Sequence, residues 1–186
     1  PRILCKPNPD RIALGRTSAW VDGWSSEVES LWASAADSVW WDASLKSTFH
    51  GQTRLVFSSI VSSGEALALQ LWLTNRGSKW NTAIQLTDPA RLSNPNGQHD
   101  TATLRGGIEI DRYGAAVNYN IRKSHPGDLF SGTLFTFGGG EWETVPAYMP
   151  WGRPRVMHIY DPDRIGQTRG KPMIASGVRT IKMLDH

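Results

Sequence analysis

The chain has 186 residues, 39% of them hydrophobic, and a formal net charge of +3. That length and apolar fraction suit one ordinary domain or two small ones around a packed core. No run approaches the roughly 20 apolar residues of a membrane span, the start lacks the layout of a signal peptide, and the lone Cys5 excludes an internal disulfide and fits a reducing cytosol. Since the first residue is not Met, we expect a piece of a longer protein or a processed product.

Two helices are expected first. From Ser18 to Ala35, apolar residues recur at helical spacing, and Thr17 or Ser18 is available as the N-cap. The stretch from Phe49 to Val61 keeps the same spacing, and Gly64 stands where a C-terminal cap would end the helix. We expect the second helix to pack on the first.

Tryptophans accumulate on the first helix and in the loop after it. Their neighbours Glu27, Glu29 and Asp37 are acidic, whereas surfaces that stack on nucleic-acid bases usually interleave aromatic with basic residues. We therefore interpret the cluster as part of the core. Its members are Trp20, Trp24, Trp32, Trp40 and Trp41.

A first hairpin is expected after the helices. Alternating polarity predicts a strand from Ala66 to Leu73 and a returning strand from Thr82 to Leu86, with turn residues at 75–78 between them. The next stretch, 88–106, is rich in Pro, Asn and Asp, and we interpret it as an irregular excursion outside the core.

A second hairpin is expected around Tyr113-Gly114, with Ile108 to Ile110 and Val117 to Ile121 as its strands. Loops with a possible short strand at Leu134 to Phe137 follow, and Val156 to Tyr160 predicts the last strand. Pro172 then begins a closing helix. The fold class is therefore α+β, with an N-terminal helical pair packed on a small antiparallel, barrel-like sheet and a C-terminal helix.

The sequence carries no convincing catalytic motif. It has neither the Gly-x-x-x-x-Gly-Lys that cradles phosphate nor a Gly-x-Ser-x-Gly nucleophile turn. His158, in a strand between Val156 and Tyr160, is interpreted as a hydrogen-bonded structural histidine, and none of the histidines has the spacing of a metal site. We expect no enzyme, no metal and no cofactor. The histidines are His50, His99, His125, His158 and His186.

Basic residues gather toward the C-terminus, where residues 150–186 hold seven Lys and Arg against three Asp and Glu. Such an excess can attract a polyanion by releasing counterions. For any single residue, however, a solvated surface position paired with Asp161 or Asp163 is the favoured interpretation. Gly166 and Gly170 are expected to form a structural turn that sets the angle of the final helix. The candidate contacts to DNA or to a partner are Arg153, Arg155, Arg164, Arg169 and Lys171.

The segment from Glu143 to Leu184 has a distinctive order of motifs. Val145-Pro146-Ala147 precedes a Pro/Gly/Arg loop, which leads to the strand around His158 and then to Gly166-Gln167-Thr168-Arg169-Gly170. Upstream blocks, among them Gly51-Gln52-x-Arg54 and Arg105-Gly106-Gly107, also stand in the expected order. In this order nearly the whole chain resembles the portal proteins of tailed bacteriophages, the lambda-like family.

The resemblance implies a non-enzymatic subunit of a ring at one capsid vertex, through which a terminase motor threads DNA and to which head-tail connector proteins bind. Its partners would be other portal subunits, terminase, connector and capsid proteins, with double-stranded DNA passing weakly and non-specifically and no membrane involved. It would reside in the virion, and in the host cytoplasm during assembly. The family's leading segment and long C-terminal portion have no counterpart here.

By the same resemblance, residues 1–64 would be a helical part of a wing-like region, 65–160 a β-rich wing or clip, and 161–186 a turn and the start of a stem or wing helix. Two alternatives remain open at this point. A stand-alone nucleic-acid-binding module predicts tight, salt-dependent binding to short duplexes. A hydrolase with an unfamiliar site predicts perturbed side chains converging in one deep pocket.

Overall fold

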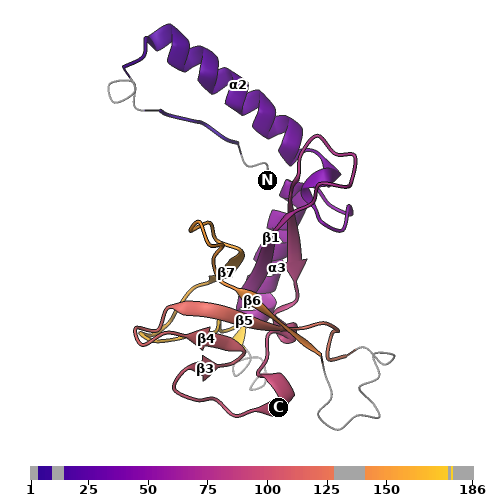
Figure 1. The fold of residues 1–186 in the computed structure, drawn as a ribbon, viewed down its shortest axis with the longest axis vertical. Coiled ribbons are helices and arrows are strands. Elements are labelled where there is room, and N and C mark those ends of the chain that lie inside the picture. Colours follow the sequence, from indigo (N-terminus) through magenta and orange to yellow (C-terminus); the bar gives the residue numbers. More distant parts are fainter. Residues whose placement is uncertain (1–3, 10–14, 128–140, 176, 178–186) are drawn as a thin grey trace. The chain divides into compact units, whose positions relative to one another are not determined.

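The computed structural model describes residues 4–9, 15–127, 141–175 and 177 (Figure 1). The chain divides into two compact units: a first unit of Pro1–Arg54 and Trp72–Ile84, and a second unit of Leu55–Leu71 and Gln85–His186. Within the described ranges no helix is both long and apolar enough to cross a membrane. The α-helices are α2 (Ser18–Ala36) and α3 (Phe49–Ser63), with short 3-10 helices at Val39–Trp41, Pro89–Arg91 and Pro95–Gly97.

The strands form two sheets. One has the order β2-β1-β7 and the other the order β3-β4-β5-β6. β7 pairs antiparallel with β1, and the four strands of the second sheet pair antiparallel in sequence. The bounds are β1 Glu65–Trp72, β2 Thr82–Thr87, β3 Leu104–Arg105, β4 Ile108–Ile110, β5 Ala116–Arg122, β6 Trp142–Pro146 and β7 Val156–Tyr160.

The α+β class is confirmed, but the expected barrel is wrong for the described strands. Closing a barrel requires every strand to pair on both sides with a continuous stagger. Here each sheet ends in strands with one free edge, β2 and β7 in one and β3 and β6 in the other. The connection from β6 to β7 leads from one sheet to the other, but none of the described strand pairs joins the two sheets.

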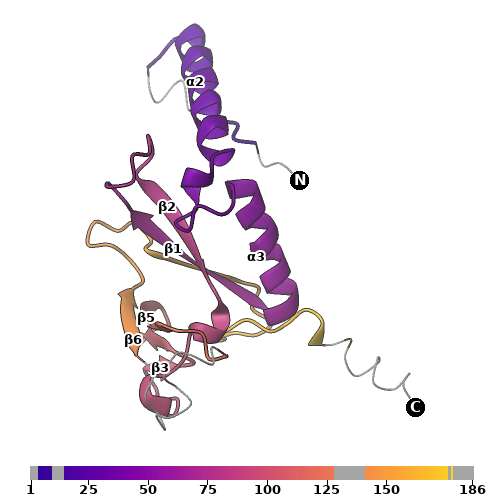
Figure 2. The same ribbon diagram turned by 90° about the vertical axis from the view of Figure 1, so that its right-hand side faces the viewer.

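The helix ends follow the sequence signals. The Thr17 hydroxyl accepts a hydrogen bond from the Trp20 amide at 3.3 Å, which caps α2. Gly64 ends α3 with φ of +88°, a left-handed conformation that favours glycine, and its amide donates to the carbonyl of Ile60. In the second unit the later part of α3 lies alongside β1 (Figure 2).

The tryptophan cluster is only partly a core, which corrects the sequence interpretation. Trp32 and Trp41 join Phe49 in edge-to-face contacts, with ring centroids 5.0 to 5.7 Å apart. Trp20 and Trp24 instead stack on each other at 6.4 Å and remain 42% and 39% exposed. Helical spacing identifies an apolar stripe but not what covers it, and of the α2 residues only Ala35 and Ala36 are buried. Trp40 is also exposed.

The core of the second unit lies where the two sheets contribute apolar side chains. Leu67 of β1 and Ile108 of β4 are its most deeply buried apolar members. Leu92 belongs to it as well, although the sequence placed 88–106 outside the core, because an isolated bridge to Ile121 draws this stretch onto β5. The core is made of Leu67, Leu69, Leu92, Ile108, Ile110, Tyr119, Ile121, Val145, Ala147 and Val156.

The sequence pattern predicted one pair of the remaining strands and missed another strand. The second hairpin is confirmed: β4 pairs with β5, and the Asp111 carboxylate accepts from the amides of Tyr113 and Ala115 in the turn. β6 was not predicted, because Glu143 and Thr144 interrupt its apolar alternation. The possible strand at 134–137 lies outside the described residues, as does most of the closing helix expected after Pro172, of which only residues up to 175 and residue 177 are described and Met173 and Ile174 lie in a turn.

The aromatic contacts distinguish two tryptophans of the same helix. We expect Trp32→Ala to lower the free energy of unfolding by about 3 kcal/mol, because it removes the edge-to-face contacts with Trp41 and Phe49. Trp24→Ala is the matched control and should cost less than about 1 kcal/mol, because its ring touches mainly Trp20 and solvent. Urea unfolding followed by circular dichroism measures both, and equal losses would contradict this division of the cluster.

Candidate functional site

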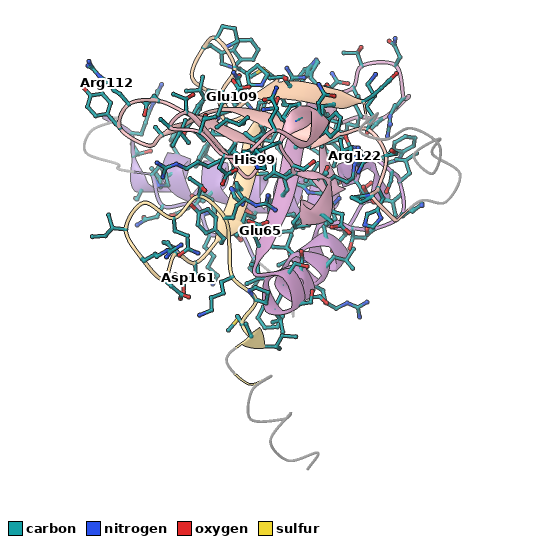
Figure 3. The ribbon with its side chains drawn as sticks, turned by 90° about the horizontal axis from the view of Figure 1, so that it is seen from below. Glu65, His99, Glu109, Arg112, Arg122 and Asp161 are labelled. Carbon is teal, nitrogen blue, oxygen red and sulfur yellow. The ribbon has the colours of Figure 1, made fainter. Side chains whose placement is uncertain are left out.

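A buried carboxylate, Glu65, organises the second unit. It is the first residue of β1, immediately after the glycine that ends α3, and its side chain is 4% exposed. Figure 3 shows Glu65 in the middle of the view, whereas Arg112 projects from the periphery. A charge in such a position must be paired and hydrogen-bonded to be tolerated.

Three groups from distant parts of the sequence satisfy this carboxylate. His158 Nε2 lies 2.9 Å from Oε2 of Glu65, and the Gly170 amide donates to the same oxygen at 2.7 Å. Arg169 Nε donates to Oε1 at 2.8 Å, and the Arg169 Nη2 group donates to Oε1 as well. The interpretation of His158 as a hydrogen-bonded structural histidine is thereby confirmed.

The Arg169 guanidinium also ties together two loops of the second unit. Nη1 donates to the carbonyls of Leu92 at 2.8 Å and Gly106 at 2.6 Å, and Nη2 donates to that of Pro89 at 3.1 Å. Only arginine offers several donors in a fixed planar fork, so lysine could not replace these contacts. The guanidinium of Arg169, a candidate DNA contact in the sequence, therefore donates its hydrogen bonds to Glu65 and to three backbone carbonyls.

The turn that carries Arg169 is fixed by its own hydrogen bonds. The Gln167 side chain accepts from the Asp163 amide at 2.9 Å and donates to the Arg169 carbonyl at 2.7 Å. The Tyr160 hydroxyl donates to the Gln167 carbonyl at 2.9 Å. Gly166 opens this turn with φ of +76° and has no heavy atom near its missing Cβ.

Position 170 requires glycine because of a close backbone contact and not because of a left-handed backbone conformation. A Cβ added to it would lie 2.1 Å from the Gly64 carbonyl oxygen and 2.7 Å from Cβ of Glu65. A Cβ added to Gly64 would in turn lie 2.1 Å from the Lys171 carbonyl carbon. The end of α3 and the segment after Arg169 therefore meet backbone to backbone, which is what brings the Gly170 amide to Glu65.

The electrostatics follow from this geometry. Burial alone would raise the pKa of Glu65, but hydrogen bonds from His158, Arg169 and the Gly170 amide together lower its pKa from 4.5 to about 2. The His158 ring lies between two tyrosines, 5.8 Å from the Tyr119 ring and 4.5 Å from that of Tyr160. Burial and the neighbouring tyrosines raise the pKa of Tyr119 to about 12. Glu65 is thus charged and Tyr119 neutral across the physiological range.

Beside the Arg169 turn lies an open hollow of about 670 Å³ that gathers part of the predicted set. Arg164, Gly166, Arg169, Gly170 and Lys171 all line it. Two of its four cations are paired, Lys171 with Asp163 at 3.3 Å and Arg169 with Glu65. Arg105, Arg164 and Asp100 also line the hollow, which is therefore polar and moderately basic.

The structure places Arg153 and Arg155 elsewhere, in the loop between β6 and β7. Arg153 Nε donates to the Gln70 side chain at 2.8 Å, and the Arg155 carbonyl accepts from the Gln70 amide at 2.9 Å. Neither lines the hollow. The five basic candidates thus divide into two groups, three around the Gly166 to Gly170 turn and two on this loop.

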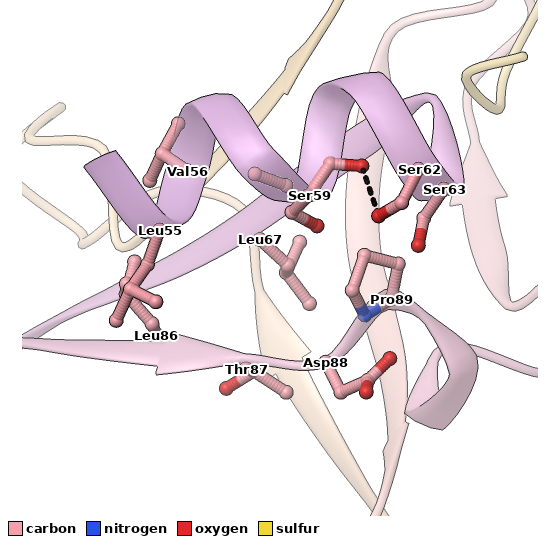
Figure 4. A pocket seen from close by; sticks show the side chains of 11 residues that line it. Leu55, Val56, Ser59, Ser62, Ser63, Leu67, Leu86, Thr87, Asp88 and Pro89 are labelled. Atoms are coloured by element: carbon pink, nitrogen blue, oxygen red, sulfur yellow. Dashed lines mark hydrogen bonds between the residues drawn. The ribbon is translucent and has the colours of Figure 1, made fainter. Parts of the chain in front are cut away.

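A second hollow, of about 390 Å³, lies between α3 and the end of β2 (Figure 4). Leu55, Leu67 and Leu86 give it an apolar lining. Two of its serine hydroxyls are already used, since Ser59 donates to the Glu65 carbonyl at 2.7 Å and Ser62 to that of Ser58 at 3.0 Å. Among the described residues no three His, Cys, Asp or Glu side chains converge as metal ligands would.

Sequence reasoning did not identify Glu65 as the centre of the network. The available signal was one charged residue at the start of a strand that continues Ala66-Leu67-Ala68-Leu69. A charge at the head of such a buried run requires a partner, but the partners lie 93 to 105 positions away. No local spacing could have revealed them.

The lowered pKa predicts a pH-dependent contribution to stability. Since the pKa of Glu65 falls from 4.5 to about 2 on folding, its stabilisation is fully present above pH 4.5 and is lost as the pH falls toward 2. The shift corresponds to about 3 kcal/mol. We expect Glu65→Gln to be destabilised at pH 7 and to show a shallower loss of stability between pH 4.5 and pH 2.5, measured by urea unfolding.

The exposed Glu143, in β6, provides the control for this experiment. Glu143→Gln should keep the pH dependence of the unchanged chain. Identical curves for Glu65→Gln and the unchanged chain would contradict the assignment of Glu65 as the buried hub.

The two glycines of the turn should respond differently to a methyl group. Gly170→Ala forces the backbone of Gly64 away and should lower the free energy of unfolding by roughly 3 kcal/mol or more, in the range of severe overpacking. Gly166→Ala meets no atom and costs only the left-handed conformation, about 1 kcal/mol. Hydrogen exchange should show lost protection of the Gly170 amide in the first variant alone, and the reverse order of effects would refute the close contact.

The family model for phage portal proteins of the lambda family matches residues 2–186. The chain is 29% identical over 187 residues to portal protein B of Escherichia phage lambda, which covers 99% of this chain and 33% of that protein. It is 30% identical over 164 residues to the portal protein of Escherichia phage N15, covering 87% of this chain and 29% of the relative. The chain thus spans about a third of the length of these relatives, and it belongs to the lambda family of phage portal proteins.

Proposed function

We propose that the chain is a segment of a portal subunit, one of many identical subunits in a ring at a single vertex of a phage capsid. DNA enters the capsid and later leaves it through this ring. The subunit contacts other portal subunits, capsid proteins, the terminase during packaging and the head-tail connector afterwards. It is present in the host cytoplasm during assembly and in the virion. The observation that carries the proposal is the family match over residues 2–186.

The proposed role is structural rather than catalytic. Supporting it, the most perturbed ionisable group, Glu65, has both carboxylate oxygens occupied by His158, Arg169 and Gly170 and so has no free position for a substrate. A catalytic carboxylate would need access to a reacting atom. The network instead fastens segments of the chain together.

We further propose the division of roles that the family resemblance suggested. Residues 1–64 form a helical part of the wing, residues 65–160 a β-rich wing or clip, and residues 161–186 a turn and the start of a stem or wing helix. The contacts of Gly170 with Gly64 and with Glu65 support a fixed junction of the third region with the end of the first and the start of the second.

The basic residues are proposed as weak contacts at most. Arg153, Arg155 and Arg164 touch phosphates transiently or face partner proteins, because DNA has to slide through a portal with few lasting contacts. Arg169 is occupied by Glu65 and three carbonyls, and Lys171 pairs with Asp163, which supports a low affinity of this region for DNA.

This proposal predicts weak binding to DNA. In a band-shift titration with unrelated short duplexes at physiological salt, we expect dissociation constants no lower than roughly 10⁻⁴ to 10⁻⁶ M, the range of non-specific binding. Arg164→Ala should change that value by no more than a few-fold, as should Arg112→Ala at the distant β4 to β5 turn. Nanomolar, sequence-selective binding that Arg164→Ala abolishes would favour a stand-alone nucleic-acid-binding module instead.

Assembly of the intact polypeptide completes the test. Electron microscopy of that polypeptide should show closed rings, whereas light scattering of residues 1–186 alone should show a monomer or weak self-association. An intact polypeptide that stays monomeric at micromolar concentration contradicts the proposed ring.

A further inference from the structure

The loop between β6 and β7, residues 147–155, presents two large aromatic side chains to solvent. Trp151 is 73% exposed and Tyr148 is 60% exposed. Figure 2 shows the chain leaving β6 through this loop, drawn in orange. Burying such rings elsewhere would be favourable, so their exposure requires an explanation.

Hydrogen bonds within the loop hold it in the conformation that exposes these rings. Inside it, the Met149 amide donates to the Arg153 carbonyl at 2.7 Å and the Gly152 amide to the Met149 carbonyl at 2.9 Å. Tyr148 forms an isolated bridge with Pro154, and Gly152 takes a φ of +87° at the tip. A preorganised loop loses little conformational entropy when it binds, which is a property of effective contact surfaces.

The chemistry of the loop is that of a protein-binding hot spot. Trp, Tyr and Arg are the residue types enriched there. Arg153 and Arg155 give the loop positive charge, and residues 147–155 contain no Asp or Glu. A suitable partner surface is therefore an apolar hollow with acidic groups at its border.

The first unit contains a hollow of this kind, of about 350 Å³, which we call the α2 groove. The walls are mainly apolar, and Leu31 remains 38% exposed there. Val28 of α2 lines the groove and is flanked in the sequence by Glu27 and Glu29, and α2 contains no Lys or Arg. On another wall Lys79 lies over the Trp80 ring at 5.4 Å. Most of the lining comes from Cys5, Val28, Leu31, Trp32, Trp41 and Trp80.

We propose that the loop of residues 147–155 of one copy of this chain docks into the α2 groove of a second copy, with Trp151 entering the groove and Arg153 or Arg155 facing Glu27 and Glu29. Both halves of the contact are present on the same chain: the loop offers exposed aromatic rings and two arginines, and the groove offers an apolar lining next to Glu27 and Glu29. This complementarity in polarity and charge favours a second copy as the occupant. A contact between two different surfaces of identical subunits propagates head to tail, and it gives a ring when the rotation from one copy to the next closes on itself. The inference rests on the proposed ring function and specifies one of its subunit contacts.

Cys5 allows a direct test, because the groove is lined by this single native cysteine of the chain. In the intact polypeptide, at a concentration more than about 30-fold above that needed for assembly of the unchanged protein, so that loss of the Trp151 ring is compensated, Trp151→Cys treated with a short bismaleimide should link copies into a ladder of dimers and higher species on a denaturing gel. Adding Cys5→Ser should abolish the ladder. Tyr113→Cys is the matched control, since Tyr113 is 79% exposed on a different turn of the second unit and should give no ladder.

A second measurement does not depend on cross-linking. Trp151→Ala should raise the protein concentration needed for assembly by about 30-fold, the effect of losing a hot-spot residue, while Tyr113→Ala should leave it unchanged. Circular dichroism should show native folding in both variants because both side chains are exposed.

The outcomes separate the two proposals. Rings that form normally while Trp151→Cys gives no ladder and Trp151→Ala assembles like the unchanged protein would overturn the docking contact and leave the ring function intact. A link that forms only within single copies would also overturn it. Absence of both rings and ladder would contradict both proposals.

Discussion

The second unit depends on the neutralisation of one buried charge. Glu65 occupies the first position of a strand whose next residues are apolar and buried, and solvent cannot stabilise its carboxylate there. The groups that replace solvent come from β7 and from the segment after it. Because Arg169 also reaches the carbonyls of Leu92 and Gly106, the same ion pair connects the irregular stretch between the sheets to the strands. Removing Arg169 would leave the buried Glu65 carboxylate with only His158 and the Gly170 amide as partners.

An interaction of this kind contributes more to the choice of structure than to the total free energy. Desolvating two charges offsets much of their attraction, so a buried pair gives little net stabilisation. A folded arrangement in which the two charges do not meet carries the full desolvation free energy without the attraction. In a protein with two small sheets and long connections, such a penalty discriminates against alternative arrangements. A subunit that must present the same surfaces in every copy of an assembly gains from that discrimination, which is consistent with the portal role proposed above.

The sequence predicted the parts of the fold that short-range signals determine. Both helices, the cap at Gly64 and the β4 to β5 hairpin follow from periodicity and turn chemistry. The features that sequence reasoning missed depend on contacts across the chain: β6 has weak alternation and is defined by pairing with β5, and Leu92 becomes a core residue only through Ile121. Trp20 and Trp24 are exposed because no distant segment covers them among the described residues, and the partners of Glu65 come from segments far along the chain. Local sequence spacing reveals neither. The order of motifs indicated the family where individual residues could not.

The backbone contact between Gly64 and Gly170 has a consequence for the order in which the chain folds. Closing a loop of about a hundred residues is entropically costly and slow, so this contact forms after the local hairpins. During synthesis, β1 leaves the ribosome long before Arg169 does, and its leading carboxylate has to remain in water until that arginine arrives. The edge of β1 that receives β7 stays open for the same interval. Folding of the second unit is therefore completed only after the segment with Arg169 and Gly170 has been synthesised. A nascent chain that stops short of Gly170 exposes an incomplete sheet to chaperones, proteases and other copies of itself.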